Sequence, residues 1–178
     1  EIEMFSITRI TNMDEKLYTL TDHLYANAFP YHEKREERAK HSALANPAYH
    51  LEAWEFDNTF VGFIGYWMFK HYAYIEHLAI DPSVRSRGFG KQILEHFLAH
   101  HPQTVLEIDP LTSEIAHRRL RFYQSLGFIQ NDFVHHHPSY HAEMSDHQLI
   151  VLSSKQALSD EQYTTFCHDL RFVVMDGV

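Results

Sequence analysis

The stretch with the clearest chemical character is Arg85-Ser86-Arg87-Gly88-Phe89-Gly90-Lys91, near the middle of the chain. It separates a strand-like apolar run from a run with helical periodicity, so we expect its glycines to open a helix. Backbone N–H groups at a helix N-terminus lack intrahelical partners and carry the positive end of the helix dipole, which suits them to bind phosphate. Glycine leaves room for a pyrophosphate close to the backbone, and the arginines and lysine add positive charge. The stretch therefore has the features of a phosphate-binding loop.

Two other phosphate motifs do not fit this stretch. A P-loop needs glycine five residues before Gly90 and a hydroxyl residue after the lysine, but these positions hold Arg85 and Gln92. A dinucleotide-binding fingerprint needs a third glycine where the chain has Ile93. Two interpretations remain, a loop for another phosphate-containing ligand and a plain turn with solvated arginines.

The elements around the loop predict a single domain, residues 1–178, of the α/β (α+β) class, since this length fits one core. The expected architecture is a mixed, mostly antiparallel central sheet with a parallel crossover at its centre, flanked by helices. Asp57-Asn58 predicts a hairpin turn, and Ser159 with Gln162 predicts a capping box at the last helix. Strands are expected over residues 5–9, 49–56, 60–69, 72–80, 105–108, 128–134 and 148–152, and helices over 14–30, 32–44, from 88 onward, 113–126 and 159–170.

Composition and charge exclude several classes of function. A formal net charge of −9 disfavours nucleic acid as the main partner, because phosphate backbones require a basic surface. No apolar run approaches the roughly 20 residues of a membrane span, so we expect no membrane association. A single cysteine, Cys167, allows no intrachain disulfide and is typical of a cytoplasmic protein. The acidic start lacks a signal peptide, and we expect Met4 to be the natural first residue, with residues 1–3 left over from cloning.

Histidine is unusually frequent, with 16 residues, some of them adjacent as in His135-His136-His137. A metal site needs several ligands that converge on one point, and no motif here sets that spacing, so we expect no bound metal. We attribute the excess of histidine to solubility near neutral pH or to lineage bias.

Two segments together resemble a known family. The first is Arg85-x-x-Gly88-x-Gly90, which follows the strand-like run at residues 74–82. The second, further along the chain, is Arg121-Phe122-Tyr123-Gln124-Ser125-Leu126-Gly127-Phe128. In this order, with a strand between them, they are similar to the acetyl-CoA-binding motif and the second signature of the GNAT superfamily of N-acetyltransferases. The surrounding sequence resembles a poorly characterised bacterial branch, although Ala116 stands where the family often has asparagine.

The resemblance implies an enzyme that uses acetyl-CoA as cosubstrate to acetylate a primary amine of a small molecule or peptide, as a monomer or homodimer. It implies that strand 76–80 splays from the next strand, so that backbone amides near Leu78 and Ile80 hold the thioester and the pantetheine arm. It implies that Tyr123 is the general acid, although the residues alone also allow a packing role. Tyr140 and Glu107 are expected in the substrate pocket. The coenzyme-binding loop residues would be Arg85, Arg87, Gly88, Phe89, Gly90 and Lys91. The alternative function is a non-catalytic acyl-CoA sensor with the same fold.

Glu76 is the candidate general base. In a regular strand it shares a face with Tyr74, Leu78 and Ile80, where burial would raise the pKa of its carboxyl group toward a useful range. His77 would then point to the opposite face. The alternative for Glu76 is a carboxylate that a neighbouring arginine neutralises.

Overall fold

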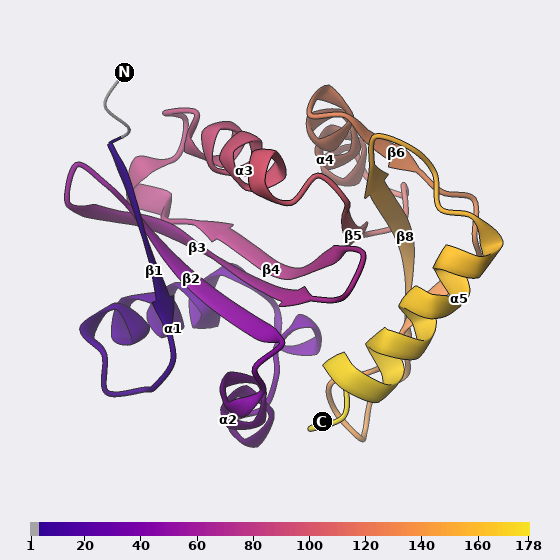
Figure 1. The fold of residues 1–178 in the computed structure, drawn as a ribbon, viewed down its shortest axis with the longest axis horizontal. Helices are drawn as coiled ribbons and strands as arrows, with labels where there is room; N and C mark the ends of the chain where they lie inside the picture. The colour runs from indigo at the N-terminus through magenta and orange to yellow at the C-terminus, as the bar shows by residue number, and fades with distance from the viewer. Residues whose placement is uncertain (1–3) are drawn as a thin grey trace.

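An open mixed sheet runs through the centre of the molecule (Figure 1). The computed structural model describes residues 4–178, and the expectation about residues 1–3 lies outside them. Neighbouring strands follow the order β1-β2-β3-β4-β5-β8-β6, and β7 also pairs with β8. The strands are β1 (Phe5–Ile10), β2 (Tyr49–Phe56), β3 (Thr59–Met68), β4 (Ala73–Ile80), β5 (Thr104–Ile108), β6 (Phe128–Gln130), β7 (His135–His137) and β8 (His147–Ser154). Among the described residues, β4 with β5 is the one parallel pair.

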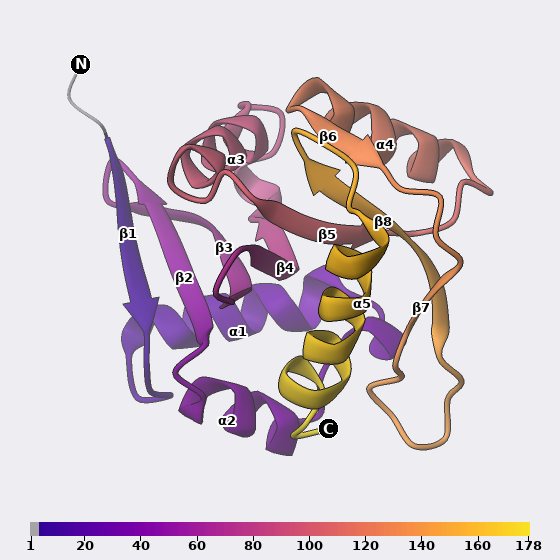
Figure 2. The ribbon, with the colours of Figure 1, turned by 45° about the vertical axis from the view of Figure 1, so that its right-hand side comes forward.

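Helices cover both faces of this sheet (Figures 1 and 2). Helices α3 and α4 pack on one face, and α1, α2 and α5 pack on the other. The helices are α1 (Lys16–Ala28), α2 (Glu37–Ala45), α3 (Phe89–His100), α4 (Glu114–Ser125) and α5 (Asp160–Asp169), with 3₁₀ turns η1 (Tyr31–Glu33) and η2 (Pro82–Val84) and a π-helical turn η3 (Leu170–Val174). Within residues 4–178, none of them is long and apolar enough to cross a membrane. The expected fold class is confirmed.

Local signals in the sequence placed several boundaries correctly. The hairpin between β2 and β3 closes at Asp57-Asn58, whose φ values of 51° and 63° are those that a two-residue type I′ turn requires. The capping box at α5 is present. The Ser159 hydroxyl accepts from the Gln162 N–H at 3.1 Å, and the Gln162 side chain accepts from the Ser159 N–H at 2.8 Å.

Two expected elements are interrupted by polar side chains that turn inward. The helix expected over 32–44 breaks before α2, because the backbone N–H of Arg35 donates to the Tyr25 hydroxyl at 2.6 Å and its side chain enters the interior. The strand expected over 128–134 ends at Gln130, the last residue of β6. The side chain of Asn131 then turns inward, where its amide group donates to the Val151 carbonyl of β8 at 3.2 Å and accepts from the Leu158 N–H at 2.8 Å. The chain resumes pairing as the short strand β7.

The parallel strands β4 and β5 stay paired only at their start. Ala73 is opposite Thr104 and Tyr74 is opposite Val105, and the described chain has no further pairing between these strands. Beyond this point they separate, which confirms the divergence that the family resemblance implies. Ends of parallel strands that separate in this way are common ligand sites in α/β folds.

A β-bulge interrupts β4 at the point where it leaves β5. On the neighbouring strand β3, Gly65 pairs with His77 and Tyr66 pairs with Ile75. Glu76 is therefore an extra residue in the ladder. A bulge bends its strand and shifts the alternation of side chains by one residue.

The bulge decides which side chains of β4 share a face. Glu76 contacts Arg35 near α2, and the ring of His77 packs against the Tyr25 ring of α1, so both point to the same side. Leu78 and Ile80 pack into the core on the α3 side. The expectation of a regular strand, with Glu76 beside Leu78 and Ile80 and His77 opposite, is wrong because the bulge adds one residue.

Asn58→Val should lower the free energy of unfolding by about 1–2 kcal/mol, because a β-branched residue is disfavoured at positive φ. Asn58 is exposed, so lost packing would not explain the effect. Asn58→Gly accepts positive φ and is the control, with stability unchanged or raised. Urea unfolding followed by circular dichroism measures both variants, and an equal loss in both would contradict the turn type.

Candidate active site

The gap between β4 and β5 opens into a cleft of about 1140 Å³. Its walls come from the end of α1, η1, β4, the loop before α3, β5, α4 and the β7–β8 segment. The volume slightly exceeds the roughly 300–1,000 Å³ of common small-molecule sites, so two substrates could share it. The predicted residues that line it are Glu76, Leu78, Ile80, Arg85, Gly88, Phe89, Gly90, Lys91, Glu107, Tyr123 and Tyr140, whereas Arg87 does not.

Two backbone amides of β4 face this gap. The Asp81 N–H donates to the Val61 carbonyl of β3 at 2.8 Å. Successive amides of a strand point to opposite sides, so the N–H groups of Leu78 and Ile80 point away from β3 and toward the gap. The strand that would accept from them in a regular sheet, β5, has already moved away.

The predicted phosphate loop joins β4 to α3 through two left-handed residues. Ser86 and Gly88 have φ values of 70° and 78°. Helix α3 then begins at Phe89, which confirms the expected helix start. The bond from the Gln92 N–H to the Gly88 carbonyl, at 3.2 Å, closes the first turn of the helix. The three backbone N–H groups that precede Gln92 have no acceptor within the helix, as is usual at a helix N-terminus.

The two glycines of this loop leave open space. A Cβ on Gly88 would have only the Gln92 side chain nearby, at 4.0 Å, so the positive φ is what favours glycine there. A Cβ on Gly90 would meet Ile80 and Phe122 at 3.7 and 3.8 Å, which are ordinary contacts. Neighbouring protein atoms therefore do not require glycine at position 90, and the missing side chain leaves the helix start accessible.

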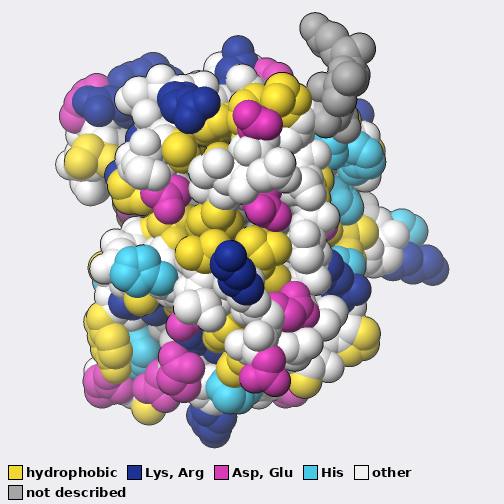
Figure 3. Space-filling model, turned by 90° about the vertical axis from the view of Figure 1, so that its left-hand side faces the viewer, with side chains coloured by type: hydrophobic (Ala, Val, Ile, Leu, Met, Phe, Trp, Pro, Cys, Tyr) yellow, Lys and Arg dark blue, Asp and Glu magenta, His cyan; other side chains and the backbone are white. Residues whose placement is uncertain are grey.

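The large side chains of the loop point in different directions. Phe89 is 4% exposed and packs in the core with Phe5 and Phe56, so it can offer a ligand only its backbone. The Arg87 guanidinium lies over the Phe89 ring, 4.9 Å from its centre. Lys91 is exposed, with its ammonium group 3.8 Å from Glu95. On the face in Figure 3, several Lys and Arg side chains lie along the upper edge, and side chains of both charges and of His are spread over the rest of the face.

Tyr123 of α4 lies where its motif predicts, at the opening between β4 and β5. Its ring packs edge-on against Phe122 and Phe128, with centroids 5.3 and 5.6 Å away. Burial raises the pKa of Tyr123, so the hydroxyl stays protonated at neutral pH. No hydrogen-bond partner of this hydroxyl occurs among the described residues, which leaves it available to a ligand.

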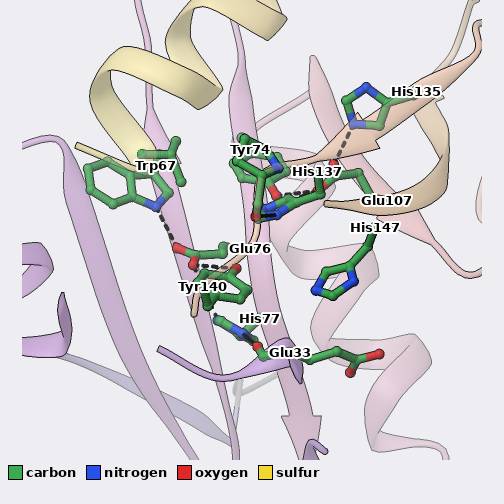
Figure 4. Close-up of polar contacts among 12 residues, drawn as sticks. Glu33, Trp67, Tyr74, Glu76, His77, Glu107, His135, His137, Tyr140 and His147 are labelled. Atoms are coloured by element: carbon green, nitrogen blue, oxygen red, sulfur yellow. Dashed lines mark hydrogen bonds and ion pairs between the residues drawn. The ribbon is translucent and has the colours of Figure 1, made fainter. Parts of the chain in front are cut away.

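Glu76 is the centre of a buried hydrogen-bond network (Figure 4). Arg35 donates to both carboxylate oxygens, at 2.8 and 3.1 Å. The Trp67 indole N–H and the Tyr140 hydroxyl donate at 2.8 Å each. The side chains of Glu76 and Arg35 are 0% and 4% exposed, so the pair is fully removed from water.

This environment overturns the pKa expected for Glu76. Burial raises the pKa, but the Arg35 charge and the hydrogen bonds from Arg35 and Trp67 outweigh it and lower the pKa to about 2. Of the two interpretations of Glu76, the structure shows the second, a carboxylate that a neighbouring arginine neutralises. With every oxygen engaged and so low a pKa, Glu76 is a poor proton acceptor near neutral pH.

A second buried carboxylate, Glu107 of β5, has partners of its own. His135 Nε2 lies 2.6 Å from one oxygen, and the Tyr74 hydroxyl donates to the other. His137 Nε2 is 4.0 Å away, and the Tyr163 hydroxyl contacts His135 Nδ1 at 2.8 Å. Burial raises the pKa of Glu107, but the histidines and the hydrogen bonds outweigh it, so the pKa lies below its ordinary value.

Three successive carbonyl groups of η1 each accept a hydrogen bond from a histidine of another element. The pairs are Tyr31 with His141 (2.8 Å), His32 with His147 (3.0 Å) and Glu33 with His77 (2.7 Å). A carbonyl oxygen only accepts, so in every pair the Nε2 atom carries the hydrogen. We call these three imidazoles the histidine clasp. They fix η1 as one wall of the cleft.

The excess of histidine is therefore partly structural. His77, His135, His137 and His141 are 2–5% exposed, which rules out a role in solubility for these four residues. Sequence spacing could not reveal the clasp, since the clasp histidines of the β7–β8 segment lie more than a hundred residues from their partners. The described residues contain no group of three His, Cys, Asp or Glu side chains that could hold a metal ion.

An open sheet that splits at its parallel pair, beside a glycine-containing loop at a helix N-terminus, defines the class of GNAT-fold acyltransferases. Residues 15–128 match the model of the acetyltransferase (GNAT) family. The chain belongs to this family and is an acetyltransferase of the GNAT type, as its two motifs predict.

Solved structures show the same fold over almost the whole chain. A protein from Bacteroides thetaiotaomicron assigned to the GNAT acetyltransferases matches with a TM-score of 0.90 and 28% identity, covering 97% of this chain and 99% of its own. The ribosomal-protein-S18-alanine N-acetyltransferase from Escherichia coli has a TM-score of 0.60 at 17% identity, with coverages of 89% and 97%. Arabidopsis thaliana Naa50, in complex with the bisubstrate analogue CoA-Ac-MVNAL, has a TM-score of 0.59 at 18% identity, with coverages of 85% and 98%. No curated protein matches the chain.

Arg35→Met should lower the free energy of unfolding by about 3–5 kcal/mol, because it leaves the Glu76 carboxylate buried without its counter-charge. Combining it with Glu76→Gln should recover much of that loss. Guanidinium unfolding at pH 7 measures both variants. If the double variant is no more stable than Arg35→Met alone, the buried charge is not the cause of the loss.

Glu76 should also make stability fall in acid. Its folded-state pKa of about 2 lies below the roughly 4.3 of an unfolded glutamate, so its contribution is present above about pH 4 and is lost as the pH falls toward 2. Thermal melts between pH 5 and 2 should show a smaller decline for Glu76→Gln than for the wild type. Parallel declines would assign the acid sensitivity to other groups.

Proposed function

We propose that the protein transfers the acetyl group of acetyl-CoA to a primary amine of a small molecule or peptide, in the cytoplasm. The observation that carries this proposal is the gap between β4 and β5, with free amides along one wall and the phosphate loop at its end. The Leu78 and Ile80 amides would hold the pantetheine arm and the thioester carbonyl. Naa50, with the same fold, is recorded with a bisubstrate analogue that contains CoA, which supports this choice of cosubstrate.

The loop fits a diphosphate on three grounds. The amides at the start of α3 have no intrahelical partner, and an anion there is favoured by the helix dipole. The space beside Gly88 is open. Arg85 and Lys91 line the cleft and can contact phosphate oxygens, whereas Arg87 lies outside the cleft and adds only its long-range charge.

Tyr123 is the residue we propose as the general acid. It lines the cleft, its raised pKa keeps the hydroxyl protonated, and no group among the described residues accepts the hydroxyl proton. It would donate that proton to the sulfur as the thiol leaves. The acceptor amine would approach from the opposite side, past η1 and the β7–β8 segment. Every residue in this scheme comes from one chain, which is compatible with a monomer or a homodimer.

Gly88→Asp should strongly weaken acetyl-CoA binding, because it places a negative charge where the diphosphate would sit. Gly88→Asn is the matched control, since asparagine has the same shape and both residues tolerate a positive φ. Isothermal titration calorimetry should give a much weaker affinity for the aspartate variant than for the asparagine variant. Equal affinities in the two variants would mean that the diphosphate lies elsewhere.

Tyr123→Phe should lower kcat about 10²- to 10⁴-fold, the usual contribution of a general acid, and leave acetyl-CoA affinity nearly unchanged. Release of free coenzyme from a panel of polyamines, aminoglycosides, amino acids and peptides provides the assay. A variant with full kcat would restrict Tyr123 to packing. Tight binding of acetyl-CoA by the wild type, without coenzyme release from any amine, would favour the acyl-CoA sensor.

A further inference from the structure

The proposed function leaves one step without a residue. A primary amine is mostly protonated at neutral pH and must lose a proton before it can attack a thioester. The carboxylates of Glu76 and Glu107 are bound by protein donors and have lowered pKa values. His77 uses its Nε2 hydrogen in the clasp, and burial lowers the pKa of its ring, which disfavours proton uptake at the other nitrogen. The proton acceptor must therefore be sought elsewhere on the acceptor side of the cleft.

We propose that Glu33 binds the ammonium group of the acceptor and takes up its proton. This inference rests on the proposed function and adds to it. Glu33 is the last residue of η1 and lines the cleft. Figure 4 shows its side chain running away from the Glu76 network, below His147.

Among the described carboxylates that line the cleft, Glu33 is the one without a hydrogen-bond donor, since Asp109 accepts from Arg119 and Asp146 accepts from the Ser139 N–H. Its recorded ion-pair contact is with His32 Nε2, at 3.7 Å, and both side chains are partly exposed, 32% for Glu33 and 41% for His32. No hydrogen bond to this carboxylate occurs among the described residues. Glu76 and Glu107, in contrast, are 0% and 5% exposed and hold several donors each. A cationic substrate can therefore reach Glu33 without displacing a protein partner.

The backbone of Glu33 is fixed although its carboxylate is free. Its carbonyl accepts from His77 Nε2 at 2.7 Å, and the two carbonyls before it are held by the other clasp histidines. A functional group works best when the element that carries it is rigid. The clasp thus sets the position of Glu33 relative to β4, where the Leu78 amide lies one residue beyond His77.

The surrounding charges favour proton uptake by Glu33. Burial raises the pKa of Glu33, the negative charge of Asp109 at the end of β5 raises it further, and His32 and Arg119 oppose this only in part. Arg119 of α4 is 3.3 Å from Asp109, so much of its charge is already paired. His147 of β8 also faces this part of the cleft. The same negative field attracts an ammonium ion.

The proposed proton transfers balance. The ammonium gives one proton to Glu33, which later releases it to solvent. The free amine forms the C–N bond to the acetyl carbon, and the C–S bond breaks. Tyr123 gives its proton to the departing sulfur, and the second proton lost by the nitrogen returns to the Tyr123 oxygen through water. Amide, free thiol and one solvent proton are the products.

Glu33→Gln tests this role while keeping the size of the side chain. With the panel amine that the wild type acetylates fastest, kcat/KM should fall about 10²- to 10⁴-fold near neutral pH. The acidic limb of the pH profile should also change, so that the rate of the variant keeps rising up to the pKa of the amine itself. Acetyl-CoA affinity by calorimetry should stay at the wild-type value. Glu37→Gln, an exposed carboxylate paired with Lys40 in the same segment, is the control and should keep both rate and profile.

Three results would overturn the assignment. One is an unchanged rate and pH profile in Glu33→Gln. Another is loss of acetyl-CoA affinity in that variant, which would indicate a structural role. A third is an altered acidic limb in His147→Asn but not in Glu33→Gln, which would move the proton acceptor to the imidazole. Failure of the proposed function itself looks different, because the wild type would then release no coenzyme with any amine.

Discussion

The ion pair between Arg35 and Glu76 connects the parts of the chain that surround the cleft. Trp67 of β3, Tyr140 of the β7–β8 segment and the carbonyl of Val174 in η3 all bind to its two side chains, the last at 2.7 Å from Arg35 Nη2. Removing both charges from water is costly, and these additional hydrogen bonds offset the cost. Because Glu76 is the bulged residue of β4, the pair also fixes the strand where it turns away from β5. The opening that defines the site depends on that contact.

The two halves of the cleft are built in different ways. The half that we assign to coenzyme comes from consecutive elements, β4, the phosphate loop, α3, β5 and α4, which carry the two family motifs. The half that we assign to the acceptor joins η1, near the N-terminus, to the β7–β8 segment more than a hundred residues later. The histidine clasp and the Arg35–Glu76 pair hold this second half together. The coenzyme half of the cleft is therefore built from neighbouring elements of the chain, whereas the acceptor half depends on contacts between residues far apart in the sequence.

The same difference explains what could be predicted from the sequence. The turn at Asp57-Asn58, the capping box of α5 and the start of α3 directly after Gly88 follow from local backbone chemistry, and all three are confirmed. The bulge at Glu76 follows from pairing with β3, and no local signal marks it. Without it, the face of His77 and the environment of Glu76 were both assigned wrongly. Arg35 was missed because the stretch that contains it reads as a solvated helix, and its partner lies 41 residues away.

The tautomers of the clasp have a consequence for how the molecule responds to acid. In each of the three contacts the hydrogen already resides on the bonded nitrogen, so the contact to the carbonyl needs no added proton, and a proton on the far nitrogen of the ring would leave it in place. Charging these rings would therefore not by itself release the turn. If turnover declines in mild acid, the cause would then be protonation of the reacting groups and not loss of the hydrogen bonds that hold η1.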